Sequence, residues 1–263
     1  MALFTDGEIN TLQDLQRYES SLLNVASVEQ IDLNAKMSLA ADEIADELLS
    51  YLLKQTPRDF GGAWFGCPTV SERRLRGVSD VVVTDSLKRW HALKSIALTY
   101  QDAYDNQLND RYQGKWLQYK QRAEITAART YQLGIALVWN PIPKASAPLL
   151  LSTTGLQFGG TFYVCVTWLN QAGQSGAPSD VVALETVDGT QLVVSPVNAP
   201  PNATGWNVYV GLTPVGVTLQ NSSPNALQTD WLLPNTGVIG GSPIPTGQNP
   251  ERYVVEDRIL QRG

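Results

Sequence analysis

The sequence of 263 residues is poor in the residue types from which most catalytic and metal sites are built. It has one histidine, His91, and two cysteines, Cys67 and Cys165, which are far apart in the chain. A zinc or haem site needs several such ligands at close spacing, and a Ser-His-Asp triad would depend on His91 alone. The chain also has no Gly-x-Ser-x-Gly motif and no Asp-x-Asp-x-Asp-Gly calcium loop. We therefore expect no enzyme activity, no bound metal and no cofactor.

Basic residues are missing from one long stretch of the chain. Residues 145–247 contain no Lys or Arg, whereas residues 1–144 are rich in charges of both signs. The net charge of −6 argues against a large nucleic-acid surface, because phosphate binding needs clustered basic side chains. The change in composition, together with Pro141 and Pro143, predicts a domain boundary at this point.

Long apolar runs are also missing. No stretch approaches the roughly 20 residues that span a bilayer, and Met1–Asp6 lacks the basic and apolar regions of a signal peptide. We therefore expect no membrane partner and no secretion signal.

Residues 1–140 are predicted to form a bundle of four to five helices. Thr5–Glu8 has the Thr-x-x-Glu form of a capping box and predicts a helix that reaches about Leu22. Apolar residues at steps of three and four predict three further helices, over about residues 32–54, 85–105 and 109–133.

Two of these helices have clear end signals. Thr84 or Asp85 is the expected N-cap of the helix that ends near Asp105, and Gly134 suits the C-cap of the last helix. The second helix carries an acidic run, which we interpret as a solvated face rather than a metal site: Asp42, Glu43, Asp46 and Glu47.

Residues 146–247 are predicted to form an immunoglobulin-like β-sandwich. Short β-branched and aromatic segments alternate with turn clusters about every ten residues. The Cys-Trp-Cys framework of antibody domains is absent, which favours a fibronectin type III-like variant. Residues 181–186 and 191–194 flank Asp188-Gly189 and predict two strands joined by a tight turn. The other predicted strands cover residues 160–168, 206–210, 217–220 and 229–232.

Two segments are predicted to be interaction elements. Residues 248–263 form an extended C-terminal tail with enough apolar side chains to need a partner, either its own domain or another protein. Residues 57–83 form a long glycine-rich and arginine-containing loop, which we interpret as facing a partner rather than a phosphate. The candidate residues of this loop are Trp64, Phe65, Arg73, Arg74 and Arg76.

Val81–Leu93, its continuation Tyr100–Tyr104, and Asp110–Tyr119 resemble the central helices of head–tail adaptor (connector) proteins of tailed bacteriophages. The resemblance covers roughly residues 5–133. It implies a helical bundle that forms a ring, typically of twelve copies, beneath the portal of the virion. The implied partners are the portal protein, other copies of the chain and a tail-side connector, stopper or nozzle protein, with DNA touching the ring only in passing. Synthesis in the cytoplasm of the host bacterium is implied as well.

The resemblance also assigns a role to the tail, because the extended terminus of such adaptors often engages the portal. The implied docking residues are Arg252, Tyr253, Val254, Val255, Arg258, Ile259 and Leu260. Aromatic residues in the first half fit an interface between ring neighbours. These residues are Trp64, Trp90, Tyr112, Trp116 and Tyr119.

Two other functions stay open. The β domain could decorate the particle or hold glycans, if some of its aromatic residues are exposed rather than in the core. The chain could also be a lysozyme-like or protease component, although it lacks a recognisable catalytic set. The aromatic residues in question are Trp168, Trp206, Tyr209 and Trp231.

Overall fold

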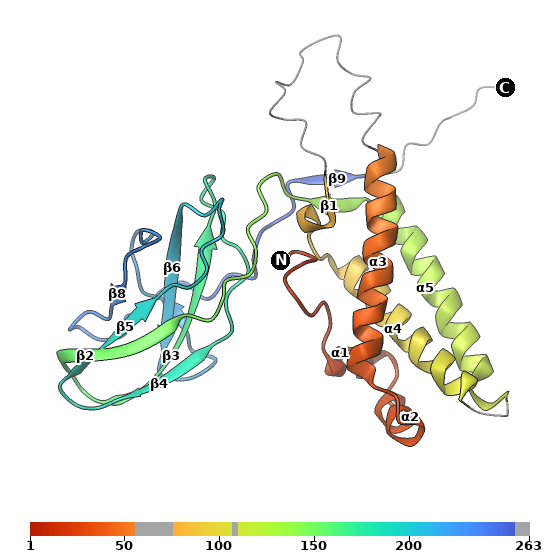
Figure 1. Ribbon diagram of the computed structural model, residues 1–263, viewed down its shortest axis with the longest axis horizontal. Coiled ribbons are helices and arrows are strands. Elements are labelled where there is room, and N and C mark those ends of the chain that lie inside the picture. The colour runs from red at the N-terminus through yellow and green to blue at the C-terminus, as the bar shows by residue number, and fades with distance from the viewer. Residues whose placement is uncertain (56–75, 107–109, 256–263) are drawn as a thin grey trace, which may run out of the picture. The chain divides into compact units, whose positions relative to one another are not determined.

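The computed structural model describes residues 1–55, 76–106 and 110–255, and these form an α+β protein (Figure 1). The chain divides into two compact units. The helical unit contains Gly7–Leu137 and, among the described residues, Glu251–Val255, while the β unit contains Met1–Asp6 and Val138–Pro250. The chain therefore passes between the units three times. The division expected from the sequence, at residues 1–140, 146–247 and 248–263, has no such exchange of terminal segments.

The helical unit contains five α-helices in its described part. Three of them confirm the predicted helices closely, including the N-cap at Thr84, whose side chain accepts from Leu87 N at 3.4 Å, and the C-cap at Gly134. The elements are α1 (Leu12–Tyr18), α2 (Leu22–Glu29), α3 (Leu33–Gln55), α4 (Asp85–Asp105) and α5 (Gln113–Leu133), with short 3-10 turns η2 (Val78–Asp80) and η3 (Asp110–Tyr112).

The predicted start of the first helix at Thr5 is wrong. The capping box that forms is at Thr11, whose N–H donates to the Asp14 carboxylate at 3.0 Å while its hydroxyl accepts from Asp14 N at 3.3 Å. Asp6 belongs instead to the β unit, where its carboxylate accepts a hydrogen bond from Lys144 N at 2.7 Å. Gly7 follows with φ of +120°, which a right-handed helix cannot contain.

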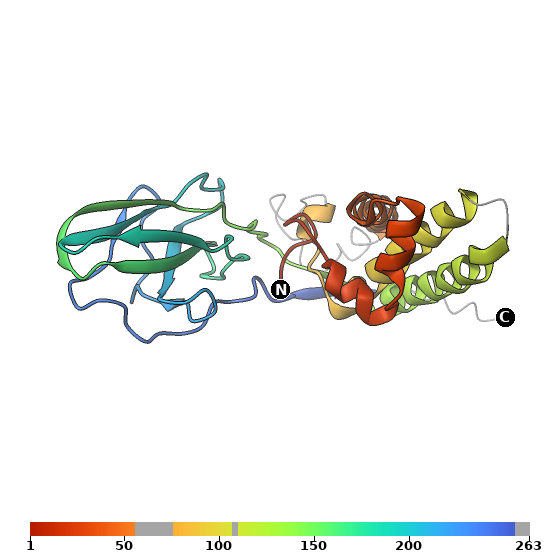
Figure 2. The same cartoon turned by 90° about the horizontal axis from the view of Figure 1, so that it is seen from below.

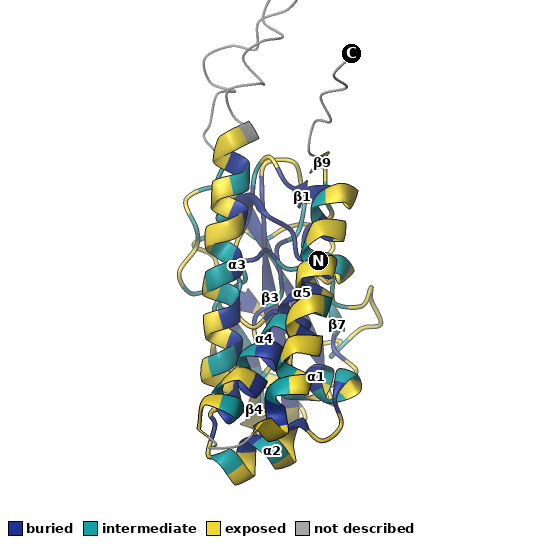
Figure 3. Cartoon of the chain, turned by 90° about the vertical axis from the view of Figure 1, so that its right-hand side faces the viewer, coloured by how far each residue is buried: buried dark blue, intermediate teal, exposed yellow. Residues whose placement is uncertain are grey.

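Helix α4 lies between α3 and α5, as Figures 2 and 3 show. It is buried on most of its sides, and Trp90, Leu93, Ile96 and Tyr100 are almost fully inaccessible to solvent. The apolar stripes of α3 and α5 pack against it from its two flanks. Helices α3 and α5 therefore each keep one face that no other described helix covers.

A small two-stranded sheet belongs to the helical unit. Strand β1 (Ile135–Leu137) follows α5 directly and pairs in antiparallel fashion with β9 (Arg252–Val254). Val81 bridges the other side of β1 at Leu137. All three residues of β1 are buried, so this sheet ties the C-terminal segment into the helical unit.

The β unit consists of two antiparallel sheets that share one core. One sheet has the order β2-β5-β8 and the other the order β4-β3-β6-β7. Trp168, Trp206 and Val208 from the second sheet meet Leu192 and Val194 from the first in a single apolar cluster. The strands are β2 (Leu149–Gln157), β3 (Gly160–Leu169), β4 (Val182–Thr186), β5 (Thr190–Ser195), β6 (Gly205–Gly211), β7 (Thr218–Leu219) and β8 (Trp231–Leu232).

Two features of the β unit differ from the prediction. Strands β4 and β5 do flank a turn at Asp188-Gly189, but they do not form a hairpin, because β4 pairs with β3 and β5 pairs with β2 in the other sheet. Leu184 and Leu192 thereby reach the shared core from opposite layers. Strand β2 itself is absent from the predicted strands, because its sequence of three leucines followed by Ser-Thr-Thr has no period-two alternation.

Candidate interaction surfaces

The residues with most potential for chemistry are buried and occupied by structural contacts. The His91 ring lies between Asn10, whose amide is 2.9 Å from Nδ1, and the Met37 carbonyl, 3.0 Å from Nε2. Cys165 is fully buried, and this burial raises the pKa of its thiol to about 12. Within the described part of the chain, no group of three or more His, Cys, Asp or Glu side chains could hold a metal ion, and no helix is long and apolar enough to cross a membrane.

Most of the aromatic residues expected at surfaces lie in the two cores. Trp90, Tyr112 and Tyr119 are buried in the helical unit, so they are not available to a ring neighbour. Among the described members of this set, only Trp116 is partly exposed. In the β unit, the side chains considered for stacking on sugars are buried too. They are Trp168, Trp206, Tyr209 and Trp231.

The outer face of α3 carries a continuous stripe of leucines and aspartates. Leu39, Asp42, Asp46, Leu49 and Leu53 recur at steps of three and four and are all exposed, opposite the buried face of the helix (Figure 3). Among the described residues, no ion pair neutralises Asp42 or Asp46. The stripe is therefore acidic at its centre and apolar at both ends.

Two neighbouring carboxylates on α3 have a different role. Lys94 of α4 lies 3.0 Å from Glu43 and 2.7 Å from Glu47, and these two contacts tie α3 to α4. The same contacts raise the pKa of Lys94, although its burial acts in the opposite direction. The acidic run thus divides into two residues that hold the bundle together and two that face outward.

The outer face of α5 is apolar and basic. Leu117 and Ile125 are exposed on this face, and Lys120 and Arg129 are exposed on its two opposite edges. The only acidic residue within α5 is Glu124. The α3 stripe is therefore acidic, whereas the outer face of α5 is apolar with a small net positive charge from Lys120, Glu124 and Arg129.

The inner side of α5 is fixed by a buried carboxylate. Glu19 accepts hydrogen bonds from Lys115 Nζ at 2.6 Å, Ser21 Oγ at 2.6 Å and the Tyr119 hydroxyl at 2.8 Å. Burial alone would raise the pKa of Glu19, but these three donors lower it to about 2. Lys115 is consequently engaged in the fold, which leaves Lys120 and Arg129 as the outward basic charges, alongside the exposed Glu124.

No protein-family model matches this chain, and no curated protein matches it significantly. The surfaces of the two units therefore carry the functional argument.

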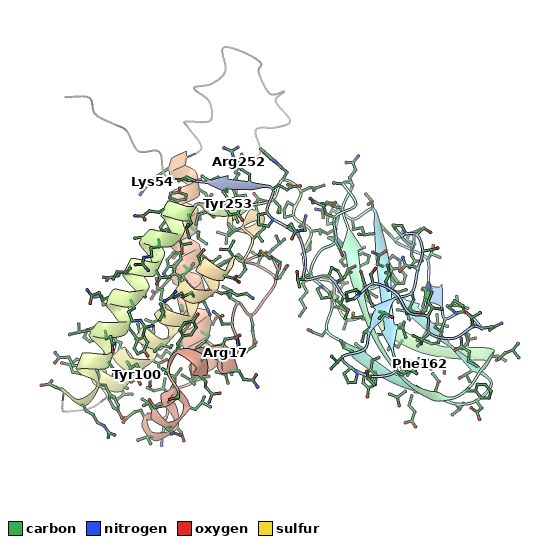
Figure 4. The ribbon with its side chains drawn as sticks, turned by 180° about the vertical axis from the view of Figure 1, so that it is seen from behind. Arg17, Lys54, Tyr100, Phe162, Arg252 and Tyr253 are labelled. Atoms are coloured by element: carbon green, nitrogen blue, oxygen red, sulfur yellow. The ribbon has the colours of Figure 1, made fainter. Side chains whose placement is uncertain are left out.

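Four of the predicted tail residues lie at or beside β9. Arg252, Tyr253 and Val254 form the strand, and Val255 follows it (Figure 4 labels Arg252 and Tyr253 near Lys54 of α3). The strand is held by β1 and by the Tyr51 hydroxyl, which donates to the Val254 carbonyl at 3.3 Å. Val254 is buried, whereas the side chains of Tyr253 and Val255 are exposed.

The remaining predicted site residues are mostly outside the described residues. This holds for Trp64, Phe65, Arg73 and Arg74 of the loop, and for Arg258, Ile259 and Leu260 of the tail. Arg76 is described and is partly buried just before η2.

The outward stripes of α3 and α5 are absent from the sequence-based candidate residues. A signal for the α3 stripe was present, because Leu39, Leu49 and Leu53 fall outside the apolar stripe that predicts this helix.

Proposed function

We propose that this chain is a structural protein that assembles into a ring, with α3 of one copy against α5 of the next. The observation that carries the proposal is the acidic, leucine-containing stripe of α3 together with the apolar, net basic outer face of α5. The leucines of the α3 stripe and Leu117 and Ile125 of α5 would supply apolar contact, and Asp42 and Asp46 would attract the basic side chains Lys120 and Arg129. A contact between two different faces of identical subunits is head-to-tail, and it closes into a ring when the rotation permits.

Within this proposal, the ring is the head–tail adaptor of a tailed bacteriophage, located in the virion beneath the portal. The resemblance of the helices supports this assignment, and so does the fixed position of β9. Because β9 is anchored on the helical unit, Val255 and the residues after it would start from a defined point and could reach the portal. The tail-side partner would be a connector, stopper or nozzle protein. The role is structural and needs no catalytic residue and no cofactor.

We also propose that the β unit is an immunoglobulin-like sandwich. The order β4-β3-β6-β7 corresponds to strands C′-C-F-G of that fold, and β2-β5 corresponds to strands B-E. The short strand β8 beside β5 takes the position of strand D. In this interpretation, the loops that follow β2, β4 and β6 lie together at one end of the sandwich.

Those loops support a second candidate function, a binding or decorating module. Five large apolar side chains on these loops or at the end of β2 are between 63% and 96% exposed, namely Leu156, Phe158, Val187, Leu212 and Val215. Patches of this kind often mark interaction sites. A glycan array probed with the full chain tests the sugar-binding version of this function, and the absence of any retained glycan would contradict it.

Charge exchange tests the ring contact. The double variant Asp42→Lys/Asp46→Lys should weaken self-association by about tenfold or more, and so should Lys120→Glu/Arg129→Glu, because each places like charges together. Mixing the two variants should restore assembly in which they alternate. The lysines on α3 of the first variant then face the glutamates on α5 of the second, and the unchanged α3 of the second faces the unchanged α5 of the first. Light scattering after size-exclusion chromatography measures each case. Glu8→Lys, at an exposed position outside both stripes, is the matched control.

Assembly that is insensitive to both double variants would contradict the α3–α5 contact. Quantitative mass spectrometry of purified phage particles from the source tests the adaptor assignment separately. We expect a ratio to portal protein near one to one. Absence from the particles, or a copy number in the hundreds, would contradict the adaptor function while leaving the ring contact to be judged by the charge exchange.

A further inference from the structure

The two sheets of the β unit have four outer edges, and three of them are protected from pairing with another strand. The edge at β7 is covered, because Leu219 N donates to the Ser242 carbonyl at 2.9 Å and Thr218 bridges Pro243. The edge at β8 is only two residues long. The edge at β4 carries Glu185, and a charged side chain disfavours edge-to-edge pairing.

The fourth edge, at β2, has none of these protections. The strand is nine residues long, and residues 145–179 contain no charged residue at all. Leu149 and Leu151 of this strand are exposed. Long, uncharged and apolar edges are normally avoided in soluble proteins, because they are templates for another strand.

The hydrogen-bond pattern shows which backbone groups of β2 face this free edge. Leu192 of β5 lies opposite Ser152, and its carbonyl accepts from Leu233 N at 3.0 Å, on the side away from β2. Facing pairs in an antiparallel ladder alternate between bonded and non-bonded. Ser152 therefore directs its N–H and C=O outward. Leu150 and Thr154, two residues to either side, do the same. Within the described part of the chain, no backbone group pairs with them there.

We propose that the free edge of β2 pairs with β2 of a second copy of this chain, in antiparallel orientation about a two-fold axis. The pairing would join two three-stranded sheets into one six-stranded sheet. A row of outward N–H and C=O groups is satisfied by another strand, whereas a lipid or apolar surface offers it no hydrogen bonds. The carboxylates of Asp180, Glu185 and Asp188 lie outside β2, so two neutral β2 strands meet without repulsion between like charges. Leu149 and Leu151 of both copies then share one face of the joined sheet.

This contact is independent of the proposed ring. A two-fold pairing uses the same surface on both copies, whereas ring neighbours use two different surfaces. The β2 contact therefore joins chains that are not ring neighbours, either free chains before assembly or chains of two separate rings.

The test uses the full chain in the Asp42→Lys/Asp46→Lys background, which removes the proposed ring contact. We expect a dimer in analytical ultracentrifugation at micromolar concentration. We also expect hydrogen exchange at the amides of Leu150, Ser152 and Thr154 to slow as the protein concentration rises. These amides are free in the isolated chain, so only the pairing would protect them.

Two variants address the edge directly. Ser152→Pro removes an outward N–H without removing a bond to β5, and Ser152→Lys adds a charge to the edge. Each should weaken dimerisation by about tenfold or more. Val187→Lys adds the same charge at an exposed turn and is the matched control. Tryptophan fluorescence from the buried Trp168 and Trp206 reports whether each variant is folded.

A chain that stays monomeric with rapidly exchanging edge amides would overturn the proposal, and so would a dimer that survives both Ser152 variants. Edge amides that become protected only in purified particles, and never in the isolated chain, would assign the edge to a different protein and would also overturn self-pairing.

Discussion

The only histidine of the chain is held in one protonation state by its neighbours. The Asn10 amide donates to both the Lys88 carbonyl and His91 Nδ1, which leaves Nε2 as the donor to the Met37 carbonyl. A proton on Nδ1 would place two donors against each other inside the core. Burial accordingly lowers the pKa of His91 below its usual 6.5, with the bond to Met37 acting in the opposite direction.

This arrangement predicts that acid destabilises the fold before the carboxylates titrate. In the unfolded chain His91 gains its proton near pH 6.5, whereas in the folded chain it does so only at lower pH. The stabilisation that neutral His91 gives the folded state is therefore fully present above pH 6.5. As the pH falls below this value, the free energy of unfolding decreases by at most about 1.4 kcal/mol per pH unit. Urea unfolding between pH 7.5 and 5 measures this slope. His91→Gln should flatten it, and an equal slope in wild type and variant would contradict the prediction.

At the scale of single elements, the C-terminal strand depends on one glycine. Gly134 has φ of +96°, and a Cβ at this position would lie 3.0 Å from Val255 Cγ2 and 3.2 Å from Tyr253 Cβ. Both the backbone conformation and the space exclude a larger residue, so Gly134 allows α5 to end where β1 must pair with β9.

Gly134→Ala should lower the free energy of unfolding by about 1–3 kcal/mol, because it combines strain at positive φ with a close contact. It should also speed hydrogen exchange in β9. Gly114→Ala is the control, since nothing lies within 4 Å of its Cβ position and it sits in the first turn of α5. That substitution should be neutral or stabilising by up to about 1 kcal/mol. Equal effects of the two variants would contradict the proposed role of Gly134.

The elements differ in how far the sequence alone predicts them. Helices α3, α4 and α5 are predictable because their apolar periodicity agrees with their caps, such as Thr84. Strand pairing is less predictable. The sequences of β4 and β5 look like a hairpin, but the two strands pair in different sheets, one in each layer of the β unit. The acidic stripe of α3 is harder to predict, because the sequence does not show which of the four carboxylates pair with another helix. Glu43 and Glu47 are taken up by Lys94 of α4, and only the folded structure shows this.

At the scale of the whole chain, the two ends are exchanged between the units. Leu3 and Phe4 are buried, Met1–Asp6 group with the β unit, and Asp6 accepts from the backbone of Lys144. Strand β9 belongs to the helical unit. A fragment limited to residues 146–247 would lack both Met1–Asp6 and the fully buried Ile142, so it is a poor substitute for the β unit.

Deletion of residues 2–6 should therefore destabilise the β unit, although these residues precede the helices in sequence. We expect faster hydrogen exchange in β3 and β6 and unchanged exchange in α4. Loss of the buried Leu3 and Phe4 side chains corresponds to about 2–5 kcal/mol. Faster exchange in α4 with no change in β3 would contradict the assignment of this segment.

The three crossings of the chain, after Asp6, Leu137 and Pro250, also have a mechanical consequence. When a force pulls the two units apart, the tension is carried by the covalent crossing after Leu137 and also by the two exchanged terminal segments, which noncovalent contacts such as the β1–β9 pairing hold in place. After a single protease cut in the crossing that follows Leu137, noncovalent contacts of the two exchanged terminal segments would still hold the units together. An architecture of this kind tolerates damage that would sever a protein whose domains follow one another in simple succession.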